Sequence, residues 1–167
     1  KKNVQNLLSR KFSFSSMEFG IQVENTPFTP FKFQSEKDIS FQQIMTTLNE
    51  KPKNISVVVF SQNPISVTDS SIQSKHFKIM PNGFPSSVDF LLFKFFVSQS
   101  LISNHLVKIA VISANDFFAS SYVIARWLID EKGINLTQAI EALRKSFSIG
   151  FIEIDLKEKL TQMYIYE

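Results

Sequence analysis

The chain of 167 residues contains no cysteine and only two histidines, His76 and His105. Without cysteine, disulfide bonds, cysteine-based zinc sites and thiolate nucleophiles are all excluded. The two histidines stand far apart in the sequence, and no acidic residues surround them at the spacing of metal ligands. We therefore expect neither a metal site nor a cofactor.

Long apolar runs and dense basic stripes are also absent. A membrane-spanning helix needs roughly 20 apolar residues in succession, but the longest apolar stretch, Val88 to Val97, is interrupted by Asp89 and Lys94. The net charge is +3, and the basic residues occur in scattered pairs such as Arg144-Lys145. We expect no membrane partner, and the composition does not indicate a nucleic-acid-binding protein, although it leaves RNA contact open.

The composition is that of a folded domain, with 44% hydrophobic and 20% charged residues and as many as 18 phenylalanines. A chain of this length can bury one sizeable core. Residues 1–18 are polar and rich in serine, which indicates an arm or extension. The remaining residues, 19–167, are predicted to form a single domain.

The hydrophobic pattern predicts strands alternating with helices, followed by helices alone. Tandem prolines make residues 25–31 an extended loop, and we expect the phenylalanines of residues 26–33 to dock onto a sheet edge. The long helix is apolar on almost every side, which favours a position inside the core. The fold class is therefore α/β, with a central mixed sheet flanked by helices. The expected strands are 55–60, 76–80 and 106–112, and the expected helices are 40–50, 86–103, 120–131, 135–146 and 154–164.

One strand–loop–helix unit has the layout of a phosphate cradle. A strand ends at Ile112, a seven-residue loop runs from Ser113 to Ala119, and Ser120 or Ser121 caps the next helix. Backbone N–H groups in such a loop and the positive end of the helix can surround a phosphate. Since any α/β fold contains units of this kind, the layout alone is a weak signal.

The segment from Val111 to Ile129 resembles the signature of the cysteine-dependent protein and RNA phosphatases. In that family a strand ends in His-Cys, five residues follow, and an arginine opens a helix. The continuation agrees, because Asn135 to Gly150 and Leu156 to Tyr164 are similar to the two helices that follow in the family. The resemblance implies a phosphatase-like fold with a remnant of the phosphate cradle.

The upstream part of the chain is similar to one branch of this family, the RNA 5′-triphosphatase domain of metazoan-type mRNA capping enzymes. The similarity rests on Lys75 to Ile79, on Pro85 to Phe90 and on the Thr26-Pro-Phe-Thr-Pro-Phe31 stretch. Together the resemblances cover roughly residues 20–165. They imply an intracellular protein, nuclear if the capping link is correct and otherwise cytoplasmic.

The residues that carry catalysis in the family are replaced in this chain. Ser113 stands at the position of the cysteine, and Ile112 stands at the position of the preceding histidine. Asp116 takes the place of the loop glycine, and Ala119 takes the place of the arginine that clamps phosphate oxygens. A serine hydroxyl has a far higher pKa than a thiol and needs a neighbouring base to act as a nucleophile. The resemblance therefore implies a pseudophosphatase with no catalytic residues.

The remnant of the phosphate loop comprises eight residues, and we expect Phe117 or Phe118 to turn inward and fill the former phosphate site. The alternative is a surface loop with two packed aromatic rings. No acidic residue lies between Asp69 and Asp89, so the upstream general acid of many protein phosphatases is missing as well. The eight residues are Ser113, Ala114, Asn115, Asp116, Phe117, Phe118, Ala119 and Ser120.

Other polar or aromatic residues have simpler explanations than a binding role. Arg126 and Arg144 are expected on solvated helix faces, Trp127 in the core and Asp89 on the long helix.

Three functions follow from these patterns. The first is a non-catalytic phosphatase-like domain that acts as a structural or protein-interaction module, with a protein partner or a larger complex. The second is a triphosphatase-like domain that binds RNA ends or acts as a scaffold in a capping apparatus. The third, which the residues support least, is an active enzyme that uses Ser113 or Asp116 in unfamiliar chemistry.

Overall fold

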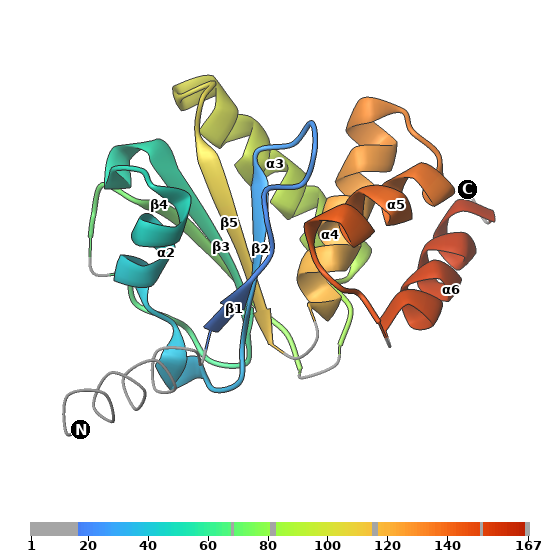
Figure 1. Ribbon diagram of the computed structural model, residues 1–167, viewed down its shortest axis with the longest axis horizontal. Helices are drawn as coiled ribbons and strands as arrows, with labels where there is room; N and C mark the ends of the chain where they lie inside the picture. The colour runs from blue at the N-terminus through green and yellow to red at the C-terminus, as the bar shows by residue number, and fades with distance from the viewer. Residues whose placement is uncertain (1–16, 68, 81–82, 115–116, 151, 166–167) are drawn as a thin grey trace, which may run out of the picture.

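A computed structural model describes residues 17–67, 69–80, 83–114, 117–150 and 152–165. Its centre is a five-stranded sheet in the order β1-β2-β5-β3-β4 (Figure 1). The strand β1 is antiparallel to β2, and the other neighbours are parallel. The strands are β1 (Met17–Phe19), β2 (Phe28–Phe33), β3 (Ile55–Ser61), β4 (Gln73–Lys78) and β5 (Lys108–Ala114).

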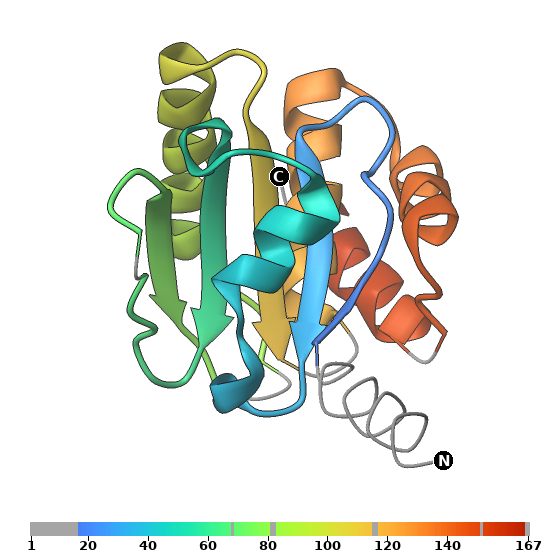
Figure 2. The same ribbon diagram turned by 60° about the vertical axis from the view of Figure 1, so that its left-hand side comes forward.

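Helices cover both faces of the sheet, as Figures 1 and 2 show. One face carries α2 (Phe41–Leu48), and short 3-10 turns, η1 (Glu36–Asp38) and η2 (Pro52–Asn54), flank that helix in the chain. The opposite face carries α3 (Ser87–Ser103), α4 (Phe118–Lys132), α5 (Leu136–Ser146) and α6 (Ile152–Ile165). The predicted α/β class with a mixed central sheet flanked by helices is thus confirmed. None of the described helices is long and apolar enough to cross a membrane.

The central strands are buried on both faces because helices pack on each side. Every residue of β3 is buried, and in β5 only the two end residues are partly exposed. Continuous β-branched runs suit such strands, since no side chain has to face water. This explains why the strand predicted at residues 55–60 is present in the structure, where it extends one residue further, to Ser61.

The predicted helix ends are largely confirmed by their caps. The side chains of Ser40, Ser86 and Asn135 each accept a hydrogen bond from a backbone N–H in the first turn of the following helix. Gly133 ends α4 in the left-handed conformation, with φ of 66°. Such caps satisfy backbone groups that a helix end would otherwise leave unpaired.

The stretch after Asn25 is not an extended loop docked at an edge, because β2 lies inside the sheet between β1 and β5. Pro30 is tolerated there because its carbonyl accepts from the N–H of Gly20, just beyond β1. In a strand, the N–H and C=O of one residue point to the same side. The N–H that Pro30 lacks would therefore point toward β1, so its absence removes no hydrogen bond between β2 and β5.

The prediction that α3 is enclosed by the core is wrong. Its buried residues are Phe90, Phe93, Val97 and Ser100, which form a single face. The opposite face is exposed although it is apolar.

Other predicted bounds differ by a few residues. The strand expected at 106–112 is β5 at 108–114, the one expected at 76–80 is β4 at 73–78, the helix expected at 40–50 is α2 at 41–48, and α6 begins at Ile152 rather than Ile154. Of the predicted arm, Met17 and Glu18 belong to β1, while residues 1–16 lie outside the described part of the chain.

Phe28 should be one of the main contributors to the free energy of unfolding. Its ring is fully buried and packs against Trp127, edge to face at 4.9 Å between centroids, and against Phe93 at 5.5 Å. Phe28→Ala should lower the free energy of unfolding by about 3–5 kcal/mol. Phe19→Ala, where the ring is 51% exposed, should lower it by about 1 kcal/mol or less. Urea denaturation measures both, and equal losses would contradict this description of the core.

Candidate functional site

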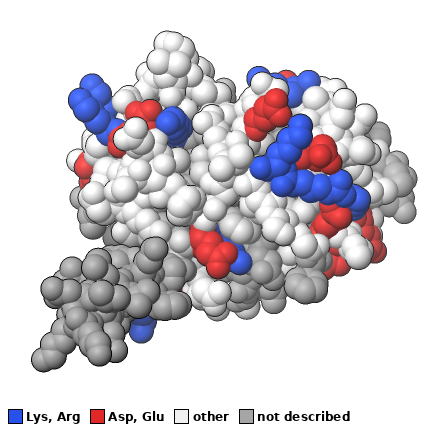
Figure 3. All heavy atoms as spheres, viewed as in Figure 1, with Lys and Arg blue, Asp and Glu red and all other residues white. Residues whose placement is uncertain are grey.

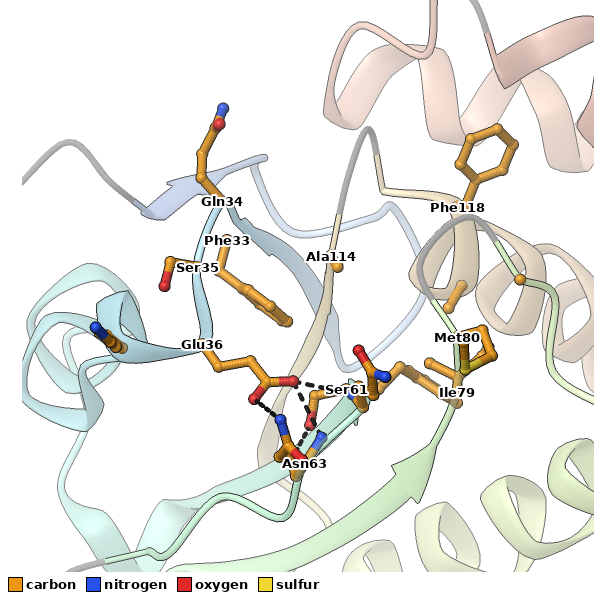
Figure 4. Close-up of a pocket in the computed structure, with 15 residues that line it drawn as sticks. Phe33, Gln34, Ser35, Glu36, Ser61, Asn63, Ile79, Met80, Ala114 and Phe118 are labelled. Atoms are coloured by element: carbon orange, nitrogen blue, oxygen red, sulfur yellow. Dashed lines mark hydrogen bonds between the residues drawn. The ribbon is translucent and has the colours of Figure 1, made fainter.

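A cavity of about 350 Å³ opens where the parallel strands end. Because β2, β5, β3 and β4 run in the same direction, their carboxyl ends meet at one edge of the sheet, where open α/β sheets usually bind ligands. Figure 4 shows Glu36 and Asn63 on one side of the cavity and Met80 and Phe118 on the other. The lining residues are 33–37, 60–63, Ile79, Met80, Gly83, Ala114, Phe118 and Ala119.

Ser113, at the position that resembles the catalytic cysteine, is buried and hydrogen bonded internally. Only 1% of its surface is exposed, and the cavity wall includes its neighbour Ala114 but not Ser113. Its hydroxyl donates to Ser120 Oγ at 3.0 Å and accepts from the Ser120 N–H at 3.4 Å. The hydroxyl is therefore bonded to a second hydroxyl, which cannot act as a base.

The helix after the loop begins at Phe118 and not at Ser120, so the prediction that Ser120 or Ser121 caps it is wrong. Phe117 occupies the cap position in the left-handed conformation, with φ of 63° and no side-chain capping bond. The hydroxyl of Ser120 instead donates back to the Phe117 carbonyl at 3.1 Å. Both serines lie in the first turns of α4 and are fully buried.

The two loop phenylalanines point to different places. Phe117 packs on Phe147, with 4.3 Å between ring centroids, and does not line the cavity. Phe118 lines the cavity, and its ring meets Phe84 edge to face at 5.4 Å.

Ile112 and Ala119, the other described positions at which the family's catalytic residues are replaced, are both buried. Ile112 is fully buried in the core cluster beneath α2, and Ala119, 3% exposed, lines the cavity without a polar side-chain atom. Asn115 and Asp116 lie outside the described residues.

Glu36 is a cavity residue that sequence reasoning missed. Its Oε1 accepts from the backbone N–H groups of Gln62 and Asn63, each at 3.0 Å, and its Oε2 accepts from Asn63 Nδ2 at 2.9 Å. These bonds, foremost that from the Asn63 side chain, lower the pKa of Glu36 below its ordinary value. Because the partners are distant in sequence, no local pattern signals this contact. The carboxylate engages backbone donors after β3 and places a negative charge in the cavity wall.

Ser61 and His76 form a close pair near the same edge, but the pair is not a nucleophile with its base. His76 Nε2 lies 2.8 Å from Ser61 Oγ and 3.1 Å from the Ser61 carbonyl oxygen. A carbonyl only accepts, so Nε2 carries the hydrogen in this arrangement. The Ser61 hydroxyl donates to the Asn63 carbonyl at 2.6 Å and is buried.

Three further residues singled out from the sequence lie where they are predicted. Trp127 lies in the core as predicted, and Asp89 lies on α3, where it forms a capping box with Ser86. Arg144 is exposed and pairs with Glu141 and Glu153, in agreement with a solvated face.

Arg126 contradicts its prediction, because it is only 5% exposed. Its guanidinium lies 4.1 Å from the Phe90 ring centroid, and Nη1 donates to the Tyr122 hydroxyl at 3.3 Å. Among the described residues, no group of three acidic or histidine side chains could hold a metal ion.

Glu36→Gln should remove a pH-dependent part of the stability. A carboxyl whose pKa is lowered in the folded state stabilises above its unfolded value, near 4.5, and loses this effect as the pH falls through the lower folded value. At pH 7 the wild type should therefore be more stable than Glu36→Gln, by at most about 1 kcal/mol because the site is partly exposed. The difference should shrink below pH 4.5 in thermal unfolding. Glu24→Gln, an exposed carboxylate 3.8 Å from Lys145, is the control; an equal pH dependence in both variants would contradict the role of Glu36.

No family model matches the chain, and no curated protein matches it in sequence. Solved structures do match in fold. The active form of Tk-PTP has a TM-score of 0.62 at 13% identity, over 86% of this chain and 94% of its own. A variant of human DUSP28 gives 0.60 at 12% identity, over 86% and 92% of the two chains. Kinase associated phosphatase, crystallised with its catalytic-site cysteine replaced by serine, gives 0.60 at 15% identity, over 88% and 93%. The chain therefore has the fold of the tyrosine and dual-specificity phosphatases.

Proposed function

We propose that this chain is a non-catalytic phosphatase-fold domain that acts as a structural or protein-interaction module within a larger assembly. The observation that carries the proposal is the burial and hydrogen bonding of the Ser113 side chain. At the end of β5, where the resemblance puts the nucleophile, the hydroxyl is buried and its hydrogen bonds go to Ser120.

The nucleophile is the first part of the chemistry that is missing. In the matched structure of kinase associated phosphatase a serine was substituted for the catalytic-site cysteine, and this chain carries Ser113 at the corresponding position of its motif. A thiolate forms readily near neutral pH, whereas a serine hydroxyl requires a base. The partners of Ser113 Oγ are a hydroxyl and a backbone N–H, and neither removes a proton.

The phosphate clamp is the second missing part. Ala119 lies in the cavity wall where the family motif has arginine, and it offers no hydrogen-bond donor from its side chain. Lys37 lines the cavity, but so does Glu36, whose carboxylate carries the opposite charge. Each lost stabilising group raises a reaction barrier by on the order of 2.7–4 kcal/mol. Loss of both nucleophile and clamp therefore makes the family's reaction too slow to matter.

Binding of RNA ends in a capping apparatus is the alternative that the upstream resemblance suggests, and it would make the protein nuclear rather than cytoplasmic. The charge distribution gives it little support. On the face drawn in Figure 3, basic and acidic side chains intermingle over the half that α4, α5 and α6 occupy. Arg144 pairs with Glu141 and Glu153, and Lys145 with Glu24. A phosphate-binding surface requires unopposed positive charge, and RNA affinity that falls steeply with salt would reveal one.

The proposal predicts no turnover of an aryl phosphate or of triphosphate-ended RNA above the rate of buffer alone. Release of inorganic phosphate by the purified wild-type chain is the measurement, and Ser113→Ala is the matched variant, since it removes only the hydroxyl. The two proteins should be equally inactive. Turnover by the wild type that disappears in Ser113→Ala would overturn the proposal in favour of an active enzyme.

A further inference from the structure

The outer face of α3 is apolar, exposed and free of charge. Its large side chains are between 43% and 76% exposed, and they lie opposite the buried face of Phe90, Phe93 and Val97. The spacing of three, four and seven residues aligns them in one stripe along the helix. The stripe consists of Val88, Leu91, Leu92, Phe95 and Ile102.

Nothing else in the described part of the chain covers this stripe. Figure 2 shows α3 as the outermost helix of its layer, on the side away from α5 and α6, and the side chains of the stripe remain exposed. The charged residues of α3 lie at the flanks, where each has a partner: Lys94 pairs with Asp130 and Glu131, and Asp89 caps the helix with Ser86. The stripe itself is bordered by polar but uncharged side chains, Ser98 and Gln99 among them.

We propose that this face binds the same face of a second copy of the chain, forming a symmetric dimer through antiparallel α3 helices. A twofold contact places residues near the axis against their own copies, so a charged residue there would meet its like. A face without charge satisfies this requirement, whereas an interface for an acidic or basic partner would carry complementary charge.

The length of the face also fits a dimer. The 17 residues of α3 span about 25 Å, enough for two helices to pack along their full length.

The stripe has a definite centre, which fixes the register. Phe95 lies midway between Val88 and Ile102, so an antiparallel contact puts Phe95 against Phe95 of the second copy and Val88 against its Ile102. In the same register Leu91 and Leu92 face Gln99 and Ser98 of the second copy. In this register the small Ser98 side chain leaves room for Leu92 of the second copy.

The dimer is independent of the chemistry in the cavity, so its failure and that of the proposed function are separate results. Sedimentation equilibrium of the full chain over micromolar to millimolar concentrations should show a monomer–dimer equilibrium. Ile102→Glu should raise the dissociation constant at least 10-fold. The matched control is Ile154→Glu on α6, where the side chain is equally exposed, 75% against 76%, and the shift should stay below about twofold.

Because the chain contains no cysteine, single cysteines can test the register directly. Phe95→Cys should form a disulfide-linked dimer under mild oxidation, and a mixture of Val88→Cys with Ile102→Cys should cross-link more readily than either variant alone. Ile154→Cys should remain uncrosslinked. A wild-type chain that is monomeric at every concentration, or equal effects of Ile102→Glu and Ile154→Glu, would overturn the proposal. Cross-linking of Ile154→Cys as efficient as that of Phe95→Cys would do the same.

Discussion

The parallel pairing of β5 with both β2 and β3 is the constraint on which the rest of this structure depends. It encloses β5 between two strands and two helical layers, so its residues from Ile109 to Ser113 are buried. It also brings the ends of four strands to one edge, which creates the cavity. The position of Ser113, the start of α4 and the direction of Phe118 all follow from where β5 ends.

The buried hydroxyl of Ser113 contributes to the stability of the fold through its hydrogen bonds. A buried hydroxyl needs partners, because an unsatisfied one costs on the order of 1–3 kcal/mol. Ser120 provides them, and in turn bonds the carbonyl of Phe117 at the helix start. The serines thus join the end of β5 to the first turn of α4.

The sequence predicted the central architecture well because its signals are local. The β-branched run of β3, the serine cap of α3 and the glycine after α4 each depend on neighbours within a few residues. The failures concern long-range contacts. Pro30 is typical of a loop in the sequence, but in the structure its carbonyl accepts a hydrogen bond from Gly20. Arg126 is predicted on a solvated face, but in the structure it packs on Phe90 and bonds Tyr122. Hydrophobicity alone also cannot tell an enclosed helix from one with an apolar outer face, which is why α3 was expected inside the core.

In the candidate site, too, local features can be predicted from the sequence and long-range contacts cannot. The substitutions at Ile112, Ser113 and Ala119 are visible in the sequence once the motif is aligned by resemblance. Glu36 is not, because its partners lie 26 and 27 residues away and meet it only when β2 and β3 end at the same edge. Its carboxylate places a negative charge in the cavity wall, and this charge opposes the entry of a phosphate.

The proposed loss of phosphate binding can be tested directly by titrating the ¹⁵N-labelled chain with inorganic phosphate and with vanadate. The backbone amides of Ala114, Phe118 and Ala119 report on the cavity where a phosphate would sit. A non-catalytic domain predicts no saturable change in their chemical shifts up to millimolar anion. Saturable shifts confined to these amides would show that the cradle still functions and would contradict the account.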